Sequence, residues 1–66
     1  MLTPRELDVL HLLARGSSYA EIAAKLGVSA NTVASHVKNT YRKLGVHTAA
    51  AAVMRAVELR LLGHTN

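Results

Sequence analysis

The chain has 66 residues, no cysteine, 50% hydrophobic residues and 3% aromatic residues. This length allows one small core, which excludes a large enzyme, and the lack of cysteine excludes a disulfide framework or a zinc ribbon. Eight Lys and Arg against four Asp and Glu give a formal net charge of +4, which favours a polyanionic partner. The sequence contains neither a long apolar run nor a signal peptide. We therefore expect a single cytoplasmic domain over 1–66 without membrane contact.

Two capping boxes open the first half of the chain. Thr3 stands three residues before Glu6, and Ser18 stands three residues before Glu21, a spacing that marks helix starts. These signals predict helices over 4–15 and 19–26, ended by Gly16 and Gly27. Apolar residues at helical spacing predict the buried faces. They are Leu7, Val9, Leu10, Leu13 and Ala14 in the first helix and Ile22, Ala23 and Leu26 in the second.

A third helix is predicted over 30–44, capped by Ser29 and ended by Gly45. At 100° per residue, one side of this helix is apolar and faces the core; it consists of Val33, Val37, Thr40 and Leu44, with Tyr41 at its edge. The opposite side is polar and basic, and we call it the outer ridge. The outer ridge consists of Asn31, Ala34, Ser35, Lys38 and Arg42.

A fourth helix is predicted over 49–62, capped by Thr48 and ended near Gly63, with 64–66 frayed. It has two apolar stripes. The first is Ala50, Val53, Met54, Val57 and Leu61, and the second is Ala52, Ala56 and Leu59. We expect the first to face the core, and the second, together with Met54, to contact a second subunit through Ala52, Met54 and Ala56. The alternative is one wide buried face. The fold class is all-α, a four-helix bundle.

The 19–26 and 30–44 helices, joined by a short turn with a glycine, form a helix-turn-helix. A DNA major groove about 12 Å wide accepts one helix, so Ala34, Ser35 and Lys38 on the outer ridge are predicted to contact base edges. The start of the 19–26 helix is predicted to bind phosphate through Ser17, Ser18 and Tyr19. From Ile22 to Val57 the chain has no acidic residue. The expected partner is double-stranded DNA.

The sequence resembles the LuxR-type helix-turn-helix domain over residues 2 to 62. The matching segments are Leu2-Thr3-Pro4-Arg5-Glu6, Gly16, Glu21-Ile22-Ala23, Leu26-Gly27-Val28-Ser29, Asn31-Thr32-Val33, His36-Val37 and Arg42-Lys43-Leu44-Gly45-Val46. The resemblance implies a bacterial transcription regulator, of which this domain is the C-terminal output part behind a receiver domain or the autoinducer-binding domain of a quorum-sensing protein. It implies a homodimer on DNA through the fourth helix, with RNA polymerase as a further partner. It also implies DNA backbone contacts from Asn31, Thr32, His36, Arg42 and Lys43.

Other interpretations stay open at this point. Region four of bacterial sigma factors has a similar Ser18–Ala23 segment, and a helical protein-interaction module would need no DNA. His36 is as well explained by a half-buried structural histidine, and Tyr19 by partial burial in the core. Ala34 stands where the family often has lysine, and it offers an apolar contact to a thymine methyl group. Catalytic motifs are missing and the four His are scattered, so we predict no enzyme, cofactor or metal.

Overall fold

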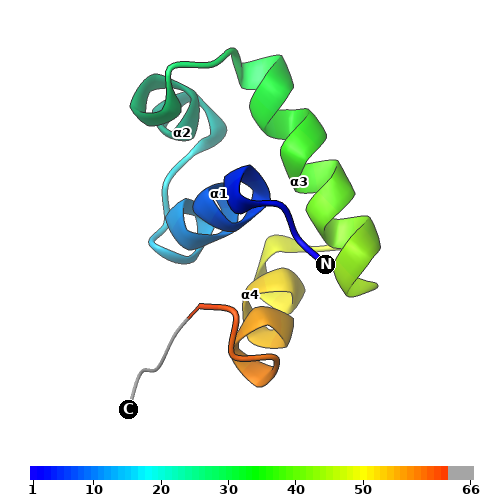
Figure 1. Cartoon of the computed structure of the whole chain (residues 1–66). Helices are drawn as coiled ribbons and strands as arrows, with labels where there is room; N and C mark the ends of the chain where they lie inside the picture. The colour runs from blue at the N-terminus through cyan, green and yellow to red at the C-terminus, as the bar shows by residue number, and fades with distance from the viewer. Residues whose placement is uncertain (63–66) are drawn as a thin grey trace.

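The computed structural model describes residues 1–62, and these form four helices without a strand. The helices are α1 (Pro4–Ala14), α2 (Tyr19–Leu26), α3 (Ala30–Leu44) and α4 (Ala49–Glu58). Figure 1 shows α1 between the other three, with α2 and α4 at opposite ends of α3. The all-α prediction is confirmed, and α2 and α3 form the predicted helix-turn-helix.

Each helix begins at the residue that its cap predicts. The Oγ1 of Thr3 accepts the Glu6 N–H, while the Glu6 carboxylate accepts the Thr3 N–H. Ser18 and Glu21 form the same reciprocal pair at α2. The Oγ of Ser29 and the Oγ1 of Thr48 each accept an N–H three residues further on. Such caps stabilise a helix by about 1 kcal/mol each, which explains why local sequence determines all four starts.

The end of α4 differs from the prediction. The helix ends at Glu58, and Arg60 takes the left-handed conformation (φ 59°) that a glycine holds after each of the other three helices. The Leu61 N–H then donates to the Ala56 carbonyl at 2.8 Å, which closes the helix in a Schellman turn. This turn folds Leu61 and Leu62 back onto the core, against which both are partly buried. The predicted end near Gly63 and the predicted fraying of 64–66 lie outside the described residues.

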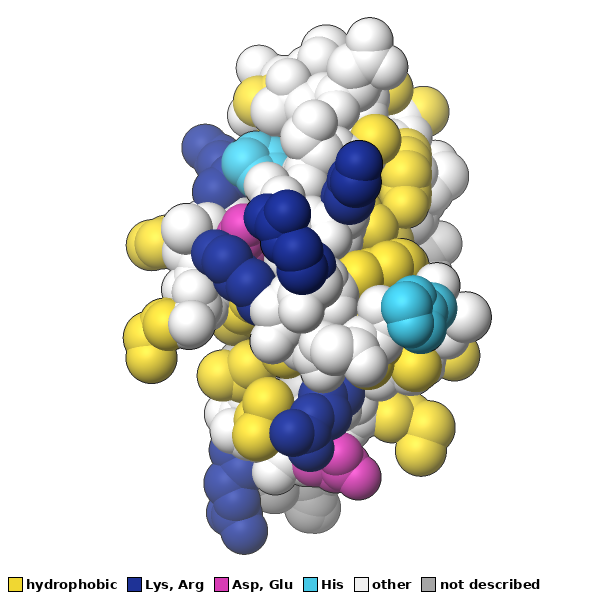
Figure 2. Space-filling model, turned by 90° about the vertical axis from the view of Figure 1, so that its right-hand side faces the viewer, with side chains coloured by type: hydrophobic (Ala, Val, Ile, Leu, Met, Phe, Trp, Pro, Cys, Tyr) yellow, Lys and Arg dark blue, Asp and Glu magenta, His cyan; other side chains and the backbone are white. Residues whose placement is uncertain are grey.

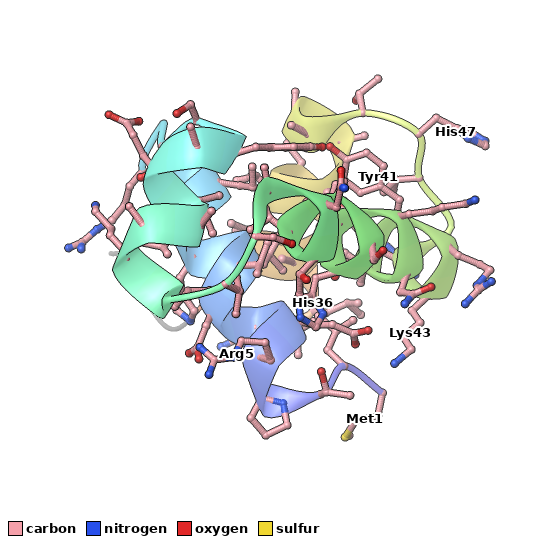
Figure 3. All side chains as sticks on the ribbon, turned by 90° about the horizontal axis from the view of Figure 1, so that it is seen from above. Met1, Arg5, His36, Tyr41, Lys43 and His47 are labelled. Carbon is pink, nitrogen blue, oxygen red and sulfur yellow. The ribbon has the colours of Figure 1, made fainter. Side chains whose placement is uncertain are left out.

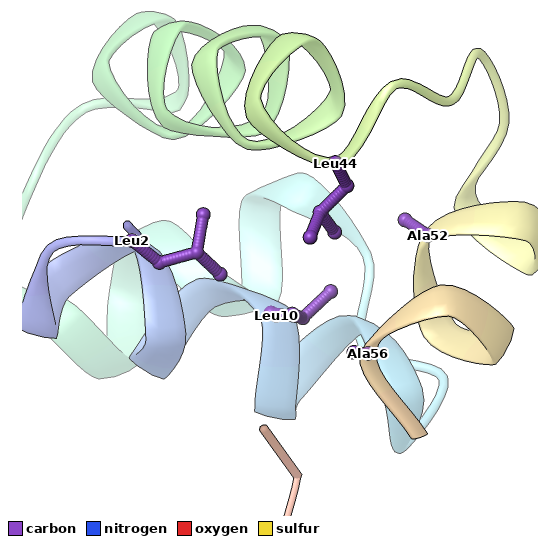
Figure 4. Packing of buried hydrophobic residues seen from close by; sticks show 5 residues of the cluster. All are labelled: Leu2, Leu10, Leu44, Ala52 and Ala56. Atoms are coloured by element: carbon purple, nitrogen blue, oxygen red, sulfur yellow. The ribbon is translucent and has the colours of Figure 1, made fainter. Parts of the chain in front are cut away.

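Two apolar clusters hold the helices together. The first joins α1, α3 and α4 and comprises Leu2, Leu10, Leu44, Ala52 and Ala56, which converge in Figure 4. The second joins α1, α2 and α3 and comprises Val9, Ile22, Ala23, Val33 and Val37. The ring of Tyr41 packs against both clusters. The apolar side of α3 is therefore buried as predicted, and its orientation sets which side chains face solvent.

The structure corrects the predicted faces of α4 at four positions, namely Ala52, Met54, Ala56 and Val57. Ala52 and Ala56 are fully buried, whereas Met54 is 68% exposed and Val57 is 47% exposed. The helix packs against both α1 and α3, and a methyl side chain lets helix backbones approach more closely than Met or Val would. The prediction that Ala52 and Ala56 contact a second subunit is thus corrected: both belong to the core. Met54 remains available to a partner.

Candidate nucleic-acid interface

The outer ridge of α3 lies free on the surface. All five of its residues, Asn31, Ala34, Ser35, Lys38 and Arg42, are exposed. On the opposite side Val33, Val37, Thr40 and Leu44 are buried, and the Thr40 hydroxyl donates to the His36 carbonyl at 2.7 Å, which satisfies it inside the core. Figure 2, which faces this side of the molecule, shows Lys and Arg side chains gathered over its middle. The predicted base-contact residues Ala34, Ser35 and Lys38 therefore share one accessible face.

One flank of the outer ridge borders the loop between α3 and α4, and we call it the loop flank. It carries a shallow concavity of about 310 Å³ lined by Lys38, Tyr41, Arg42, Val46 and His47. Figure 3 shows Tyr41 and His47 on this side of α3. Nη2 of Arg42 donates to Oδ1 of Asn39 at 2.8 Å, which restrains the guanidinium without neutralising its charge. Positive charge on this flank is open to an anion.

The other flank faces the start of α1, and we call it the α1 flank; His36 and Lys43 lie there, beside Arg5 and Met1 in Figure 3. Nζ of Lys43 is 2.8 Å from Oε1 of Glu6, a carboxylate whose side chain is only 5% exposed. Burial raises the pKa of Glu6, but the hydrogen bond from Lys43 and those from Thr3 outweigh it and hold the pKa below its usual value. Lys43 is thereby paired with a buried carboxylate of the protein itself.

Tyr19 and Tyr41 connect α2 to the loop flank. Burial, followed by the charge and hydrogen-bonding effects of the Tyr19 hydroxyl, raises the pKa of Tyr41, so its phenol stays protonated at neutral pH. Tyr19 itself is 40% exposed. Both readings of Tyr19, partial burial and access to phosphate, are compatible with this position. Ser17 is half-buried and Ser18 is exposed beside it.

Two of the remaining predicted contacts are only partly accessible. Thr32 and His36 are half-buried, and the Thr32 and Ser29 hydroxyls lie 3.0 Å apart. Two features have no local signal in the sequence. His47 lies in a loop, so the periodicity of a helix cannot predict its position. The sequence predicts Glu6 only as a helix cap, because its partner Lys43 lies 37 residues away.

Residues 1–62 bring together no group of three His, Asp or Glu side chains suited to a metal ion. None of the four helices described over residues 1–62 is both long enough and apolar enough to cross a membrane.

Comparison with known proteins identifies the sequence. A family model for bacterial regulatory proteins of the luxR family matches residues 1–56. The transcriptional activator protein YukR of Yersinia ruckeri is 44% identical over 62 residues, which are 94% of this chain and 27% of YukR. The nitrate/nitrite response regulator protein NarP of Escherichia coli strain K12 is 47% identical over 60 residues, which are 91% of this chain and 28% of NarP. The chain spans little more than a quarter of either relative.

Solved structures agree with this result. The response regulator ChrA of a heme-sensing two component system superimposes with a TM-score of 0.90 and 41% identity, covering 92% of this chain and 30% of ChrA. The transcription factor GerE superimposes with a TM-score of 0.86 and 37% identity, covering 91% of this chain and 90% of that chain. The family match includes every residue of the outer ridge, since they all lie within 1–56. The chain belongs to the luxR family of bacterial regulatory proteins, as a helix-turn-helix DNA-binding domain of that family.

Proposed function

We propose that the chain recognises a particular duplex DNA sequence by inserting α3 into the major groove, and thereby regulates transcription in the bacterial cytoplasm. The observation that carries this proposal is the exposed outer ridge on a helix whose other side is buried. A single helix fills a groove about 12 Å wide, and the acid-free span from Ile22 to Val57 leaves nothing on the ridge to repel phosphates.

Roles follow from position on α3 and on α2. We assign base contacts to Ala34, Ser35 and Lys38, where Lys38 offers an ammonium to guanine acceptors and Ala34 offers a methyl group to thymine. We assign DNA backbone contacts to the remaining exposed or half-exposed polar residues nearby. They are Ser17, Ser18, Tyr19, Asn31, Thr32, His36 and Arg42. Lys43 leaves this set, because its ammonium is already paired with Glu6 at 2.8 Å.

The test is selection of binding sites from a randomised duplex pool, followed by titration of the best site and of a random duplex by fluorescence anisotropy. We expect at least about a thousandfold preference for the selected site, with affinity that falls as salt rises. A random duplex bound as tightly as the selected one would contradict sequence-specific recognition. The absence of any salt-dependent binding would favour a protein-interaction module instead.

A homodimer on DNA is the second part of the proposal. Met54 and Val57 are exposed apolar side chains one turn apart on α4, and two side chains offer too little surface to hold a stable dimer by themselves. We expect a monomer in solution that pairs on two inverted half-sites about one helical turn apart. Met54→Glu is expected to abolish cooperativity on the double site and to leave single half-site binding intact. Ala14→Glu, which adds the same charge at an exposed position of α1, is the control.

The chain covers 27% of YukR and 28% of NarP. We propose that its 66 residues together act as the output domain of a longer regulator. The input would be a phosphorylated receiver or a quorum-sensing signal domain, and the further partner would be RNA polymerase. Promoter transcription in vitro with polymerase, with and without the chain, tests the last point. An unchanged transcript level from a promoter that carries the selected site would contradict it.

A further inference from the structure

The concavity on the loop flank includes three side chains, Tyr41, Val46 and His47, to which base recognition gives no role. Its walls are the Tyr41 ring and Val46, both of which pack against the core, and its rim carries the cations Lys38 and Arg42 together with His47. Resting on the proposed DNA binding, we infer that this concavity takes one phosphodiester of the bound DNA, and that His47 and the Tyr41 hydroxyl hold it together with Arg42.

Charge supports an anion as the occupant. The ion pairs within residues 1–62 are Arg5–Asp8, Lys43–Glu6 and Arg55–Glu58, so none of them involves Lys38, Arg42 or His47. A phosphodiester carries one negative charge on two free oxygens, and it accepts hydrogen bonds from ammonium, guanidinium and imidazole N–H groups. A shallow site suits a linkage within a continuous strand, since the strand must enter and leave it.

The Tyr41 hydroxyl supplies a further donor. Tyr41 lines the concavity, and a phenol hydroxyl donates one hydrogen bond, here to a phosphate oxygen. Burial and Tyr19 both favour the protonated Tyr41 phenol, so this hydrogen is retained at neutral pH.

The position of Tyr19 also indicates the path of the DNA. Tyr19 is the first residue of α2, and the N-terminus of α2 is the place where Ser17 and Ser18 are assigned to phosphate. Tyr41 links that end of α2 to the concavity. One DNA strand therefore runs along the loop flank, from the start of α2 past the tyrosine pair to His47.

A methylphosphonate scan tests the inference. In this probe one phosphodiester of the selected duplex at a time carries a methyl group in place of its charged oxygen, which removes the charge and leaves the bases unchanged. For the unaltered chain, we expect that neutralising the linkage at the concavity weakens binding about tenfold. In His47→Ala and in Tyr41→Phe, the penalty at that same linkage is expected to shrink severalfold, while the penalties at all other linkages stay as they were.

Controls separate this result from damage to the fold. Tyr41→Phe keeps the ring that packs against both clusters, and thermal melting of each variant verifies folding. His11→Ala, at an exposed histidine of α1, is expected to leave the whole scan unchanged. If no linkage loses its penalty in His47→Ala and Tyr41→Phe, or if all linkages change equally, the inference is overturned although DNA binding stands. A chain that binds no duplex at all overturns the proposed function as well.

Discussion

The two flanks of α3 carry basic side chains in opposite situations. On the α1 flank, Lys43 lies 2.8 Å from the buried Glu6 carboxylate. On the loop flank, Lys38, Arg42 and His47 line an open concavity in which no carboxylate takes part. A cation beside a buried acid serves the fold, because removing the cation leaves the buried carboxylate without compensation. A cation without a partner adds to the surface potential that attracts a polyanion.

The formal net charge of the chain therefore does not show where the unpaired positive charge lies. Three of the basic side chains are balanced within the described residues, namely Arg5, Lys43 and Arg55. The exposed pairs of Arg5 and Arg55 are worth little in stability, whereas Glu6 ties the start of α1 to the end of α3.

The largest expected effect is on stability. Glu6→Gln keeps an amide oxygen for the Thr3 N–H but removes the negative charge facing Lys43, so the free energy of unfolding should fall by about 2 kcal/mol. Denaturant titration measures it. Glu21→Gln alters the equivalent residue of the second capping box, which is exposed, and should cost clearly less. Equal losses in the two variants would show that Lys43 contributes nothing beyond the cap.

The next effect concerns base recognition. Lys38→Ala removes the one ammonium on the outer ridge, and a good base contact is worth about 1–3 kcal/mol. Binding to the selected duplex should therefore weaken more than binding to a random duplex. Anisotropy titrations of both duplexes at one salt concentration give the two losses. If the losses are the same, Lys38 contacts phosphate instead of a base.

A smaller effect compares neighbouring cations on the two flanks. Arg42→Ala should lower the slope of log K against log salt by about one unit, the change expected for one lost phosphate contact. Lys43→Ala should leave the slope unchanged and lower the stability, because its ammonium is paired with Glu6. Titrations over a range of salt concentrations measure both slopes. A reduced slope in Lys43→Ala would return Lys43 to the DNA backbone contacts.

The smallest effect is on pH dependence. The pKa of Glu6 in the folded state lies below its usual value of 4.5. As the pH falls, the Glu6 carboxylate therefore takes up a proton at a higher pH in the unfolded chain than in the folded chain. The stability that this ionised carboxylate provides is complete above that usual value and is lost as the pH falls through the lowered pKa. Denaturation between about pH 6 and about pH 3 should therefore show a shallower decline in Glu6→Gln than in the unaltered chain. Parallel curves for the two proteins would contradict this linkage.

Local signals determined much of the molecule. The caps at Thr3, Ser18, Ser29 and Thr48 act within three residues of themselves, so the sequence alone locates all four helix starts. The two faces of α3 were also predictable, because apolar and polar residues separate cleanly on that helix. The outer ridge, and with it the predicted base contacts, follows from that separation.

The tertiary structure decided what depends on distant neighbours. Apolar residues occupy most sides of α4, so the periodicity of the sequence could not determine which side is buried. Close packing against α1 and α3 buries the small side chains of Ala52 and Ala56 and leaves Met54 exposed. The early end of α4 at Glu58 follows from the return of Leu61 and Leu62 to the core. The Glu6–Lys43 pair and the concavity at His47 each join segments far apart in the chain. Such contacts exist only once the helices have packed, because packing alone determines which distant side chains meet.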